Sequence, residues 1–207
     1  MVALIDIIKN NETEGDEEPV FIMQQLSLLS KNTQYLLENL LKWAMLQKGQ
    51  IKVYPAKVDV RSIFETEIRL IKHTAANKNI HFKLLIKEDC YVKGDLNLLS
   101  VVFRNLLNNA MKFSHDGGIV TIEGIKNQAH LQLTIIDNGI GMPKEQVQKL
   151  FIQSINGSTI GTKGEKGTGL GLYLCKQFLE LQGASINIIS EVNKGTSVII
   201  QLPIYTN

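Results

Sequence analysis

Four glycines fall within eight residues of the chain, at Gly164, Gly167, Gly169 and Gly171. Glycine loses more backbone entropy on folding than other residues, so such a cluster is typical of places where the backbone must approach a ligand closely. An amphipathic segment follows directly, and the first turn of a helix offers unpaired N–H groups and a positive dipole end. Together these features predict an anion site that suits phosphate.

The familiar glycine-rich nucleotide fingerprints do not fit this spacing. A P-loop places Gly-Lys-Ser/Thr at a fixed distance after its first glycine, and no glycine of the chain starts such a run. A dinucleotide fingerprint that begins at Gly139 and Gly141 would require a third glycine where Lys144 stands. The sequence therefore predicts another way of holding phosphate.

Composition excludes several classes of function. The 207 residues carry a formal net charge of +2, which is too small to indicate binding to nucleic acid or to an anionic membrane. No apolar run approaches the roughly 20 residues of a membrane span, and the N-terminus lacks a secretory signal pattern. Cys90 and Cys175 lie far apart in apolar surroundings, and we interpret them as reduced core thiols of a cytoplasmic protein.

The first 50 residues are predicted to be helical, with a short apolar piece at 2–8, an acidic break, and a long helix over 20–48. Apolar residues of the long helix recur at steps of three and four, apart from the polar Thr33 between Leu29 and Leu36, and form two stripes. These are Ile22, Leu26, Leu29, Leu36, Leu40 and Trp43, flanked by Leu37, Leu41 and Ala44. A lone hairpin cannot bury both stripes, so we expect a homodimer through residues 19–48. A helix folded back on its own domain is the alternative.

The remainder of the chain is predicted to mix helices and strands. Helices are expected over 59–77, 95–113 and 143–151, the first two capped by Asp59 and Asp95, and a further helix that starts at Thr168 or the glycines beyond it and reaches Gln182. Strands are expected at 80–86, 119–125, 131–136, 186–190 and 196–202, with 51–55 as a short edge strand or linker. Residues 153–168 form a long polar loop typical of a lid. This order predicts an α+β fold, a two-layer α/β sandwich with an open mixed sheet, preceded by the helical hairpin.

Three polar residues of the expected helix after Asp95 share one face. Asn105, Asn109 and Lys112 are spaced four and three apart. An amide oxygen is a hard ligand suited to Mg²⁺, and a lysine ammonium pairs with phosphate oxygens. For this helix taken alone, a solvated polar face is an equal alternative.

A carboxylate ends one of the apolar strands. Asp137 is followed closely by Gly139 and Gly141. The carboxylate could accept a hydrogen bond from the exocyclic amine of a base, while the glycines let a flat ring lie against the backbone. An ordinary Asp-Asn-Gly turn is the alternative. The polar helix face, this turn and the glycine cluster occur together along one chain, in this order. A chance occurrence of all three is improbable.

In this order the motifs resemble the catalytic core of sensor histidine kinases, within the ATPase superfamily that also contains gyrase, the large heat-shock chaperone and a mismatch-repair protein. The similarity covers residues 51–207. Its motifs are the N box at 105–114, the first glycine box at 137–142, the start of the F box at 149–151, the second glycine box at 164–172, and the pair Gly195-Thr196.

The resemblance implies ATP and Mg²⁺ as cofactors. Asp137 would bind the adenine amino group with support from Gly141 and Thr196, and Asn109 would be the Mg²⁺ ligand. The polyphosphate would lie against Asn105, Lys112 and the backbone of Gly167, Gly169 and Leu170. The apolar adenine wall would include Ile140, Met142, Phe151 and Leu172. Gly139 and Gly171 complete the set of cofactor-binding positions.

The resemblance also bears on the reaction. Gyrase-like relatives have a glutamate that activates water at the first N-box position, whereas Asn105 stands there in this chain and favours transfer to a protein acceptor. Residues 19–50 resemble the second helix of the family's dimerisation and phosphoacceptor hairpin. No histidine of the chain has the acceptor context, so we expect a fragment whose acceptor histidine lies outside it.

Two domains are therefore expected, a truncated dimerisation hairpin at 1–50 and an ATP-binding catalytic domain at 51–207. The leading interpretation is the catalytic part of a two-component histidine kinase, cytoplasmic or the cytoplasmic part of a membrane-anchored sensor. Its expected partners are ATP and a response-regulator receiver domain, with no contact to nucleic acid or membrane. The alternatives are a non-catalytic ATP-binding regulatory module that acts through partner binding and, third, a bare ATPase.

Overall fold

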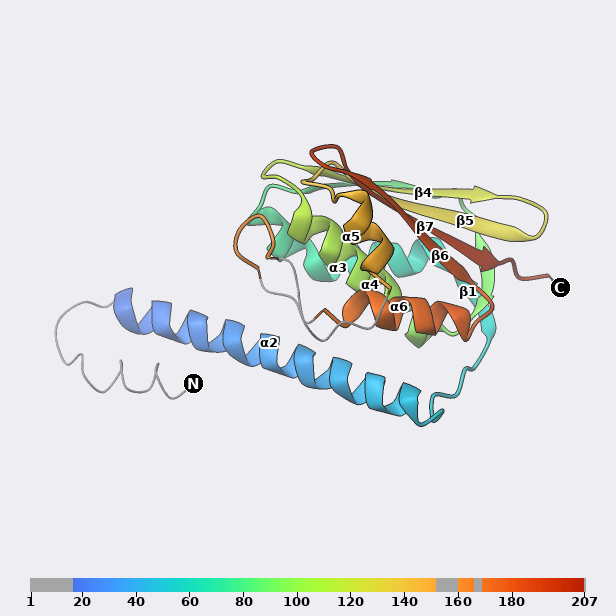
Figure 1. The fold of residues 1–207 in the computed structure, drawn as a ribbon, viewed down its shortest axis with the longest axis horizontal. Coiled ribbons are helices and arrows are strands. Elements are labelled where there is room, and N and C mark those ends of the chain that lie inside the picture. Colours follow the sequence, from blue (N-terminus) through green and yellow to red (C-terminus); the bar gives the residue numbers. More distant parts are fainter. Residues whose placement is uncertain (1–16, 152–159, 166–168, 207) are drawn as a thin grey trace. The chain divides into compact units, whose positions relative to one another are not determined.

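The computed structural model describes residues 17–151, 160–165 and 169–206 (Figure 1). The chain divides into two compact units, Met1–Lys48 and Gly49–Asn207, and each is described by itself. The short apolar piece expected at 2–8 lies outside the described residues. No helix within the described ranges is both long enough and apolar enough to cross a membrane.

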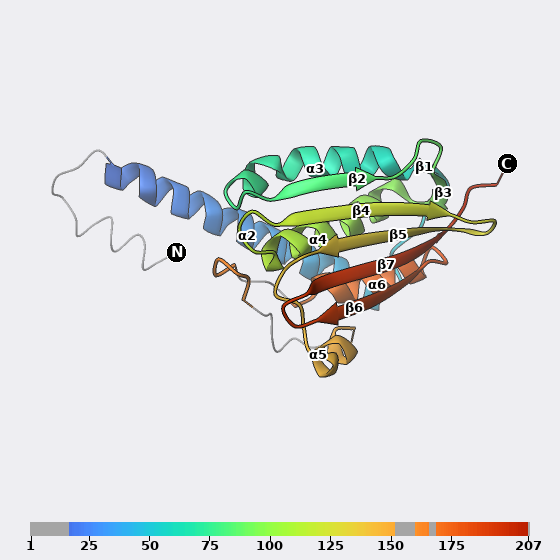
Figure 2. The same ribbon diagram turned by 90° about the horizontal axis from the view of Figure 1, so that it is seen from above.

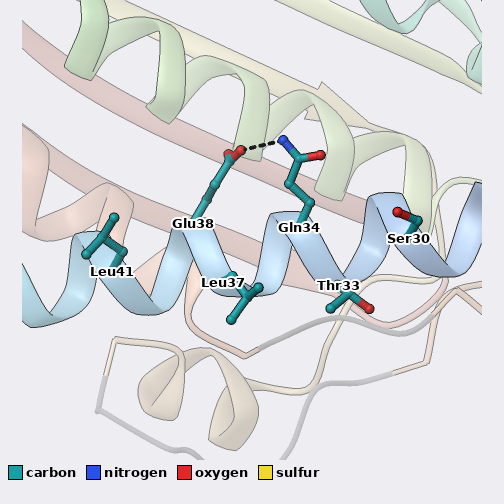
Figure 3. Close-up of a pocket in the computed structure, with 6 residues that line it drawn as sticks. All are labelled: Ser30, Thr33, Gln34, Leu37, Glu38 and Leu41. Atoms are coloured by element: carbon teal, nitrogen blue, oxygen red, sulfur yellow. Dashed lines mark hydrogen bonds between the residues drawn. The ribbon is translucent and has the colours of Figure 1, made fainter. Parts of the chain in front are cut away.

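The first unit contains the long helix α2, Glu17–Gln47, close to the 20–48 that the apolar spacing predicts. The helix ends shortly before Gly49, which adopts a φ of +62°. Leu37 and Leu41 are 61% and 63% exposed, so the second stripe is open to solvent. A hollow on this helix is lined by Ser30, Thr33, Gln34, Leu37, Glu38 and Leu41 (Figure 3).

The side chains that line this hollow lie on different sides of the helix. In Figure 3, Gln34 and Glu38 lie on one side of the helix, where Gln34 Nε2 donates to Glu38 Oε1 at 3.1 Å, and Thr33 and Leu37 lie on another. None of the residues expected to bind nucleotide lines it.

The second unit is built on a five-stranded mixed sheet with the strand order β2-β4-β5-β7-β6 (Figure 2). β2 and β4 are parallel, and every other neighbouring pair is antiparallel. The strands are β2 (His81–Leu85), β4 (Ile119–Lys126), β5 (His130–Asp137), β6 (Ser185–Glu191) and β7 (Gly195–Pro203).

Three helices cover one face of this sheet (Figures 1 and 2). They are α3 (Val60–Ala76), α4 (Leu96–Phe113) and α6 (Gly171–Glu180), and the short α5 (Lys144–Lys149) lies beside β6. Apolar side chains of α4, α6 and β5 fill the space between the layers, among them Leu99, Phe103, Leu106, Leu131, Leu133, Leu174 and Phe178. The α+β sandwich with an open mixed sheet is as the sequence predicts.

Two aspartates set the starts of α3 and α4 as expected. Asp59 accepts a hydrogen bond from the Ser62 amide at 3.3 Å. Asp95 accepts from the amides of Asn97 at 2.9 Å and Leu98 at 3.2 Å. Both satisfy amide groups that the first turn of a helix leaves unpaired.

Two short strands, β1 (Ala56–Asp59) and β3 (Tyr91–Gly94), form a separate antiparallel pair. The sequence pattern placed a strand or linker at 51–55 and missed β3. Residues 51–55 are a linker, and the strand begins just after Pro55, which has no N–H to donate to a ladder. β3 is only four residues long, too short for alternation to stand out. α6 begins at Gly171, one of the glycines beyond Thr168 at which the sequence allows this helix to start.

Candidate functional site

The polar face of α4 meets the start of α6. Asn105 is buried, and its Nδ2 donates to the Val101 carbonyl at 3.1 Å. A Cβ placed on Gly171 would lie 3.0 Å from Asn105 Oδ1, so the glycine lets the two helices approach at this point. Asn109 and Lys112 are half-buried further along the same face. The structure therefore brings part of the N box against the second glycine box.

Lys112 lies near the C-terminal end of α4, with its ammonium 4.9 Å from the centre of the Phe113 ring. Burial lowers the pKa of this ammonium below its usual range, and the nearby charge of Glu165 partly offsets that effect. A partly desolvated ammonium gains more from an added anion than a solvated one does. Such a group suits a phosphate contact.

Asp137 is the last residue of β5, where strict alternation turns Leu131, Leu133, Ile135 and Asp137 toward the helices. Asp137 is 6% exposed. Oδ1 accepts from the amides of Gly139 at 2.9 Å and Thr196 at 3.3 Å, while Oδ2 has no hydrogen-bond partner among the described residues. Burial raises the pKa of this carboxyl to about 6, against the opposing effect of the two amides. The second oxygen is thus placed to accept from a ligand.

The first glycine box passes between the end of α4 and the β6–β7 hairpin. A Cβ on Gly139 would lie 2.1 Å from the Phe113 carbonyl oxygen, and one on Gly141 would lie 1.9 Å from the Glu191 carbonyl oxygen. Gly141 also adopts a φ of +60°. Any side chain at either position would collide with backbone, so the structure explains both glycines.

A serine that sequence reasoning missed joins this box to β7. Ser190 Oγ accepts from the Met142 amide at 2.9 Å, contacts the Gly195 carbonyl at 2.9 Å, and lies 2.9 Å from Thr196 Oγ1. The available signal was weak, because Ser190 is an ordinary polar residue near the end of a strand. Only the register, in which Ser190 pairs with Thr196, gives it a role.

The remaining predicted positions lie just before α6 and just after α5. Gly169 adopts a φ of +73°, and the buried Leu170 forms the N-cap of α6. Its apolar side chain offers no acceptor for the first amides of the helix, an arrangement that favours an added anion. Phe151 is half-buried, with the Lys176 ammonium 5.5 Å from its ring centre. Gly167 and most of the expected lid lie outside the described residues.

Two groups of predicted residues thus form, and both contact α4. The carboxylate group contains Asp137, Gly139, Gly141, Met142 and Thr196, and the helix group contains Asn105 and Gly171. The Phe113 carbonyl, which accepts from the Ile140 amide at 3.1 Å, ties the end of α4 to the first glycine box. The described residues contain no cluster of three or more His, Cys, Asp or Glu side chains suited to a metal. The amide oxygen of Asn109 is a hard donor that would suit Mg²⁺.

Known proteins are similar to this chain in sequence and in fold. The chain is 37% identical over 109 residues to sensor protein SrrB of Staphylococcus aureus, an alignment that covers 53% of this chain and 19% of SrrB. The fold matches the Acinetobacter baumannii histidine kinase AdeS with a TM-score of 0.75 at 18% identity, over 99% of this chain and 93% of that one.

A further solved structure holds histidine kinase ThkA in complex with response regulator protein TrrA. Its kinase chain matches with a TM-score of 0.69 at 18% identity, over 98% of this chain and 55% of that one. Residues 94–206, more than half of the chain, match the model of the family described as histidine kinase-, DNA gyrase B-, and HSP90-like ATPase, so this chain belongs to that family and carries an ATPase domain of the histidine kinase type.

Proposed function

We propose that this chain is the ATP-binding catalytic part of a two-component sensor histidine kinase, and that it directs the γ-phosphoryl group of Mg-ATP to a histidine outside the chain. The observation that carries the proposal is the Asp137 carboxylate, buried at the end of β5 with one oxygen held by two amides. A buried carboxylate with its second oxygen left for a ligand suits the amino group of adenine.

The adenine end of the proposed site is the carboxylate group. Asp137 accepts from the adenine amino group, and Gly139 and Gly141 leave room for the ring beside the backbone. Thr196 and Ser190 hold this backbone in place through their hydrogen bonds. Met142 and Phe151, both half-buried, supply apolar contact. Discrimination against guanine follows, because guanine presents a carbonyl where adenine presents its amine.

The phosphate end lies along α4 and the start of α6. Lys112 contacts phosphate oxygens, Asn105 lies near the polyphosphate, and the amides of Gly167, Gly169, Leu170 and Gly171 complete the cradle. Asn109 holds Mg²⁺, which when bound neutralises charge on the phosphates. The chain itself binds and orients the nucleotide so that the γ-phosphorus faces the acceptor.

The acceptor completes the reaction. An imidazole nitrogen attacks the γ-phosphorus, the bond from that phosphorus to the bridging oxygen breaks, and ADP leaves with the electron pair. Asn105 supports transfer over hydrolysis, because an amide cannot take a proton from water as a glutamate does. A protein acceptor is therefore favoured over a bare ATPase reaction.

The partners follow from the same proposal. The exposed leucines of α2 support homodimerisation through residues 19–48, with residues 1–50 as the dimerisation domain and 51–207 as the ATP-binding domain. ThkA was solved with a response regulator protein, which supports a receiver domain as the partner of this chain. Sedimentation tests the dimer: Leu37→Asp with Leu41→Asp should give a monomer, while Leu70→Asp, at an equally exposed leucine of α3, should not.

Calorimetric titration of the full chain with Mg-ATP tests the nucleotide site. Asn109→Ala should weaken Mg-ATP binding strongly, and Asp137→Asn should reduce the preference for ATP over GTP. Asn187→Ala, at an exposed position of β6, is the control and should bind as the wild type does. Unchanged affinity and preference in both site variants would contradict the assignment. A chain that binds ATP normally but never supports transfer to a supplied acceptor hairpin would instead point to the regulatory module.

A further inference from the structure

A buried lysine far from α4 in sequence lies at the C-terminal end of that helix. Lys78 is 5% exposed, and its ammonium donates to the carbonyls of Met111 and Lys112, each at 2.8 Å, and to Glu165 Oε1 at 3.0 Å. A lysine ammonium has three protons to donate, so these three bonds satisfy it completely. The cost of burying the charge is thereby offset at this position.

A buried cation is stabilising at the C-terminal end of a helix. The last carbonyls of an α-helix lack partners within it and carry the negative end of the dipole. In α4, Lys78 takes up two of these carbonyls, and the Ile140 amide takes up that of Phe113. The Lys112 carbonyl accepts in addition from the Thr162 amide at 3.1 Å. The end of the N-box helix is thus fixed by three separate parts of the chain.

Glu165 ties residues 160–165 to this helix end. Its second oxygen accepts from the Lys163 amide at 2.8 Å, and its carbonyl accepts from the Gly161 amide at 2.9 Å, so the segment closes into a turn. Burial alone would raise the pKa of the Glu165 carboxyl, but backbone amides and the Lys78 ammonium lower it overall. The carboxylate is therefore charged at neutral pH.

The turn lies directly on Lys112. A Cβ on Gly161 would be 2.6 Å from Lys112 Cγ, and Thr162 Oγ1 donates to the Ser114 carbonyl at 2.7 Å. The ion pair that holds it is shielded, with side chains 7% and 37% exposed for Lys78 and Glu165. A second ion pair of the same segment, Lys163 with Asp116, is 46% and 58% exposed and longer, at 3.5 Å. Because water screens exposed pairs more strongly, the Lys78–Glu165 pair is the anchor.

We propose that Lys78 and Glu165 are positioning residues for the phosphate end of the nucleotide site, which hold the turn at 160–165 against Lys112 and the end of α4. The proposal rests on the proposed function, since it concerns the same site. The turn precedes Gly169 and Leu170 by only a few residues, so its anchoring fixes residues 160–165 near the phosphate-binding glycines before the nucleotide binds. Preordering of this kind improves affinity without a direct contact to the ligand.

Glu165 is the better residue to change. Lys78→Met would leave two buried carbonyls without a donor and lower stability for that reason alone. Glu165→Ala removes the anchor but keeps both bonds from Lys78 to α4, and Glu165→Gln keeps an acceptor without the charge. Glu65→Ala, which removes an exposed ion pair with Arg61 on α3, is the matched control.

Calorimetry with Mg-ATP and Mg-ADP, together with hydrogen exchange of the nucleotide-free chain, tests the proposal. Glu165→Ala should bind Mg-ATP about threefold to tenfold more weakly, as loss of one ordered anchor implies, with Glu165→Gln between it and the wild type. Mg-ADP should be affected less, because the turn lies at the phosphate end. The amides of Gly161 and Thr162 should exchange faster in Glu165→Ala. The melting temperature of Glu165→Gln, which keeps an acceptor for Lys78, should stay near that of Glu65→Ala.

Two outcomes would overturn the positioning role. The first is a Glu165→Ala variant that binds Mg-ATP with wild-type affinity. The second is a Glu165→Ala variant that loses equal affinity for Mg-ATP and Mg-ADP and also melts at a lower temperature, because such a residue is merely structural. A wild-type chain that binds no Mg-ATP would contradict the proposed function and this role with it. If the wild type binds Mg-ATP and Glu165→Ala binds it equally well, only the positioning role is contradicted.

Discussion

Asp137 and Thr196 stand opposite each other in the antiparallel ladder of β5 and β7, and Asp137 Oδ1 accepts a hydrogen bond from the Thr196 amide at 3.3 Å. The same oxygen accepts from the Gly139 amide at 2.9 Å. Two amides do not fully compensate for the water that this carboxylate loses on burial. Its pKa therefore rises from 3.8 to about 6.

This raised pKa predicts that the contribution of Asp137 to the free energy of unfolding falls as the pH rises. The folded chain binds the Asp137 proton more tightly than the unfolded chain, so the stabilisation is complete below pH 3.8 and is lost as the pH passes about 6. Asp137→Asn removes the charge while its amide oxygen can still accept from both backbone amides. At pH 7.5 the variant should be more stable than the wild type by up to about 3 kcal/mol, and by less at pH 5.

Urea denaturation of the nucleotide-free chain at the two pH values measures this difference. Asp89→Asn, at an exposed aspartate, is the control and should change stability little at either pH. An Asp137→Asn variant that is less stable than the wild type at pH 7.5 would show that the carboxylate is stabilised, not strained, by its site.

Ser190 should support nucleotide binding without touching the nucleotide. Its hydroxyl joins the Met142 amide to Gly195 and Thr196, so Ser190→Ala leaves these groups without a shared partner. We expect a loss of about 1–2 kcal/mol in the free energy of unfolding and a several-fold weaker affinity for ATP. Ser185→Ala, at the exposed start of the same strand, should change neither. Equal ATP affinity in the two variants would contradict the bridging role.

Much of the fold was predictable from local signals. The caps at Asp59 and Asp95 and the alternation in β5 act within a few residues of the chain, so the sequence displays them directly. The order of the site motifs was likewise visible, and Gly139 and Gly141 of the first glycine box lie at close backbone approaches.

The missed residues owe their roles to contacts between distant segments. Lys78 meets the end of α4 and Glu165, and Ser190 meets the first glycine box, across separations that no period or spacing reveals. Nothing next to Lys78 in the sequence distinguishes it from a solvated lysine. Such roles depend on topology, which a single sequence specifies only through the whole fold.

The close approach at Gly141 predicts a strong effect of one added methyl group. Gly141→Ala would place a Cβ 1.9 Å from the Glu191 carbonyl oxygen at a φ of +60°. Gly183→Ala is a matched control, because Gly183 has a φ of +70° with nothing within 4 Å of its Cβ position. We expect losses of about 3 kcal/mol or more for Gly141→Ala and about 1 kcal/mol for Gly183→Ala. Thermal unfolding and ATP titration are measured for both variants. Similar losses of stability in the two would mean that the positive φ, and not the contact with Glu191, determines the cost of the added methyl group.

The last prediction is that the chain binds Mg-ATP yet does not phosphorylate itself. Of its histidines (His73, His81, His115 and His130), only His115 is followed by an acidic residue. Asp116 is engaged elsewhere, since its Oδ1 accepts from Asn79 Nδ2 at 3.3 Å and lies 3.5 Å from the Lys163 ammonium. It is therefore not arranged to orient the His115 imidazole or to take up its proton. Without a positioned nucleophile, a complete ATP site gives no transfer.

Incubation with γ-labelled Mg-ATP, followed by acid and alkali treatment, distinguishes the outcomes. A phosphohistidine contains a P–N bond, so its label is lost in acid and kept in alkali, whereas a phosphoserine behaves in the opposite way. We expect no label on the chain alone, and a weak label on a separate hairpin that carries an acceptor histidine. An acid-labile, alkali-stable label on this chain that disappears in His115→Ala would show that the His115–Asp116 turn can rearrange into an acceptor. Because that rearrangement must first break the contact with Lys163, Lys163→Met should then increase the label.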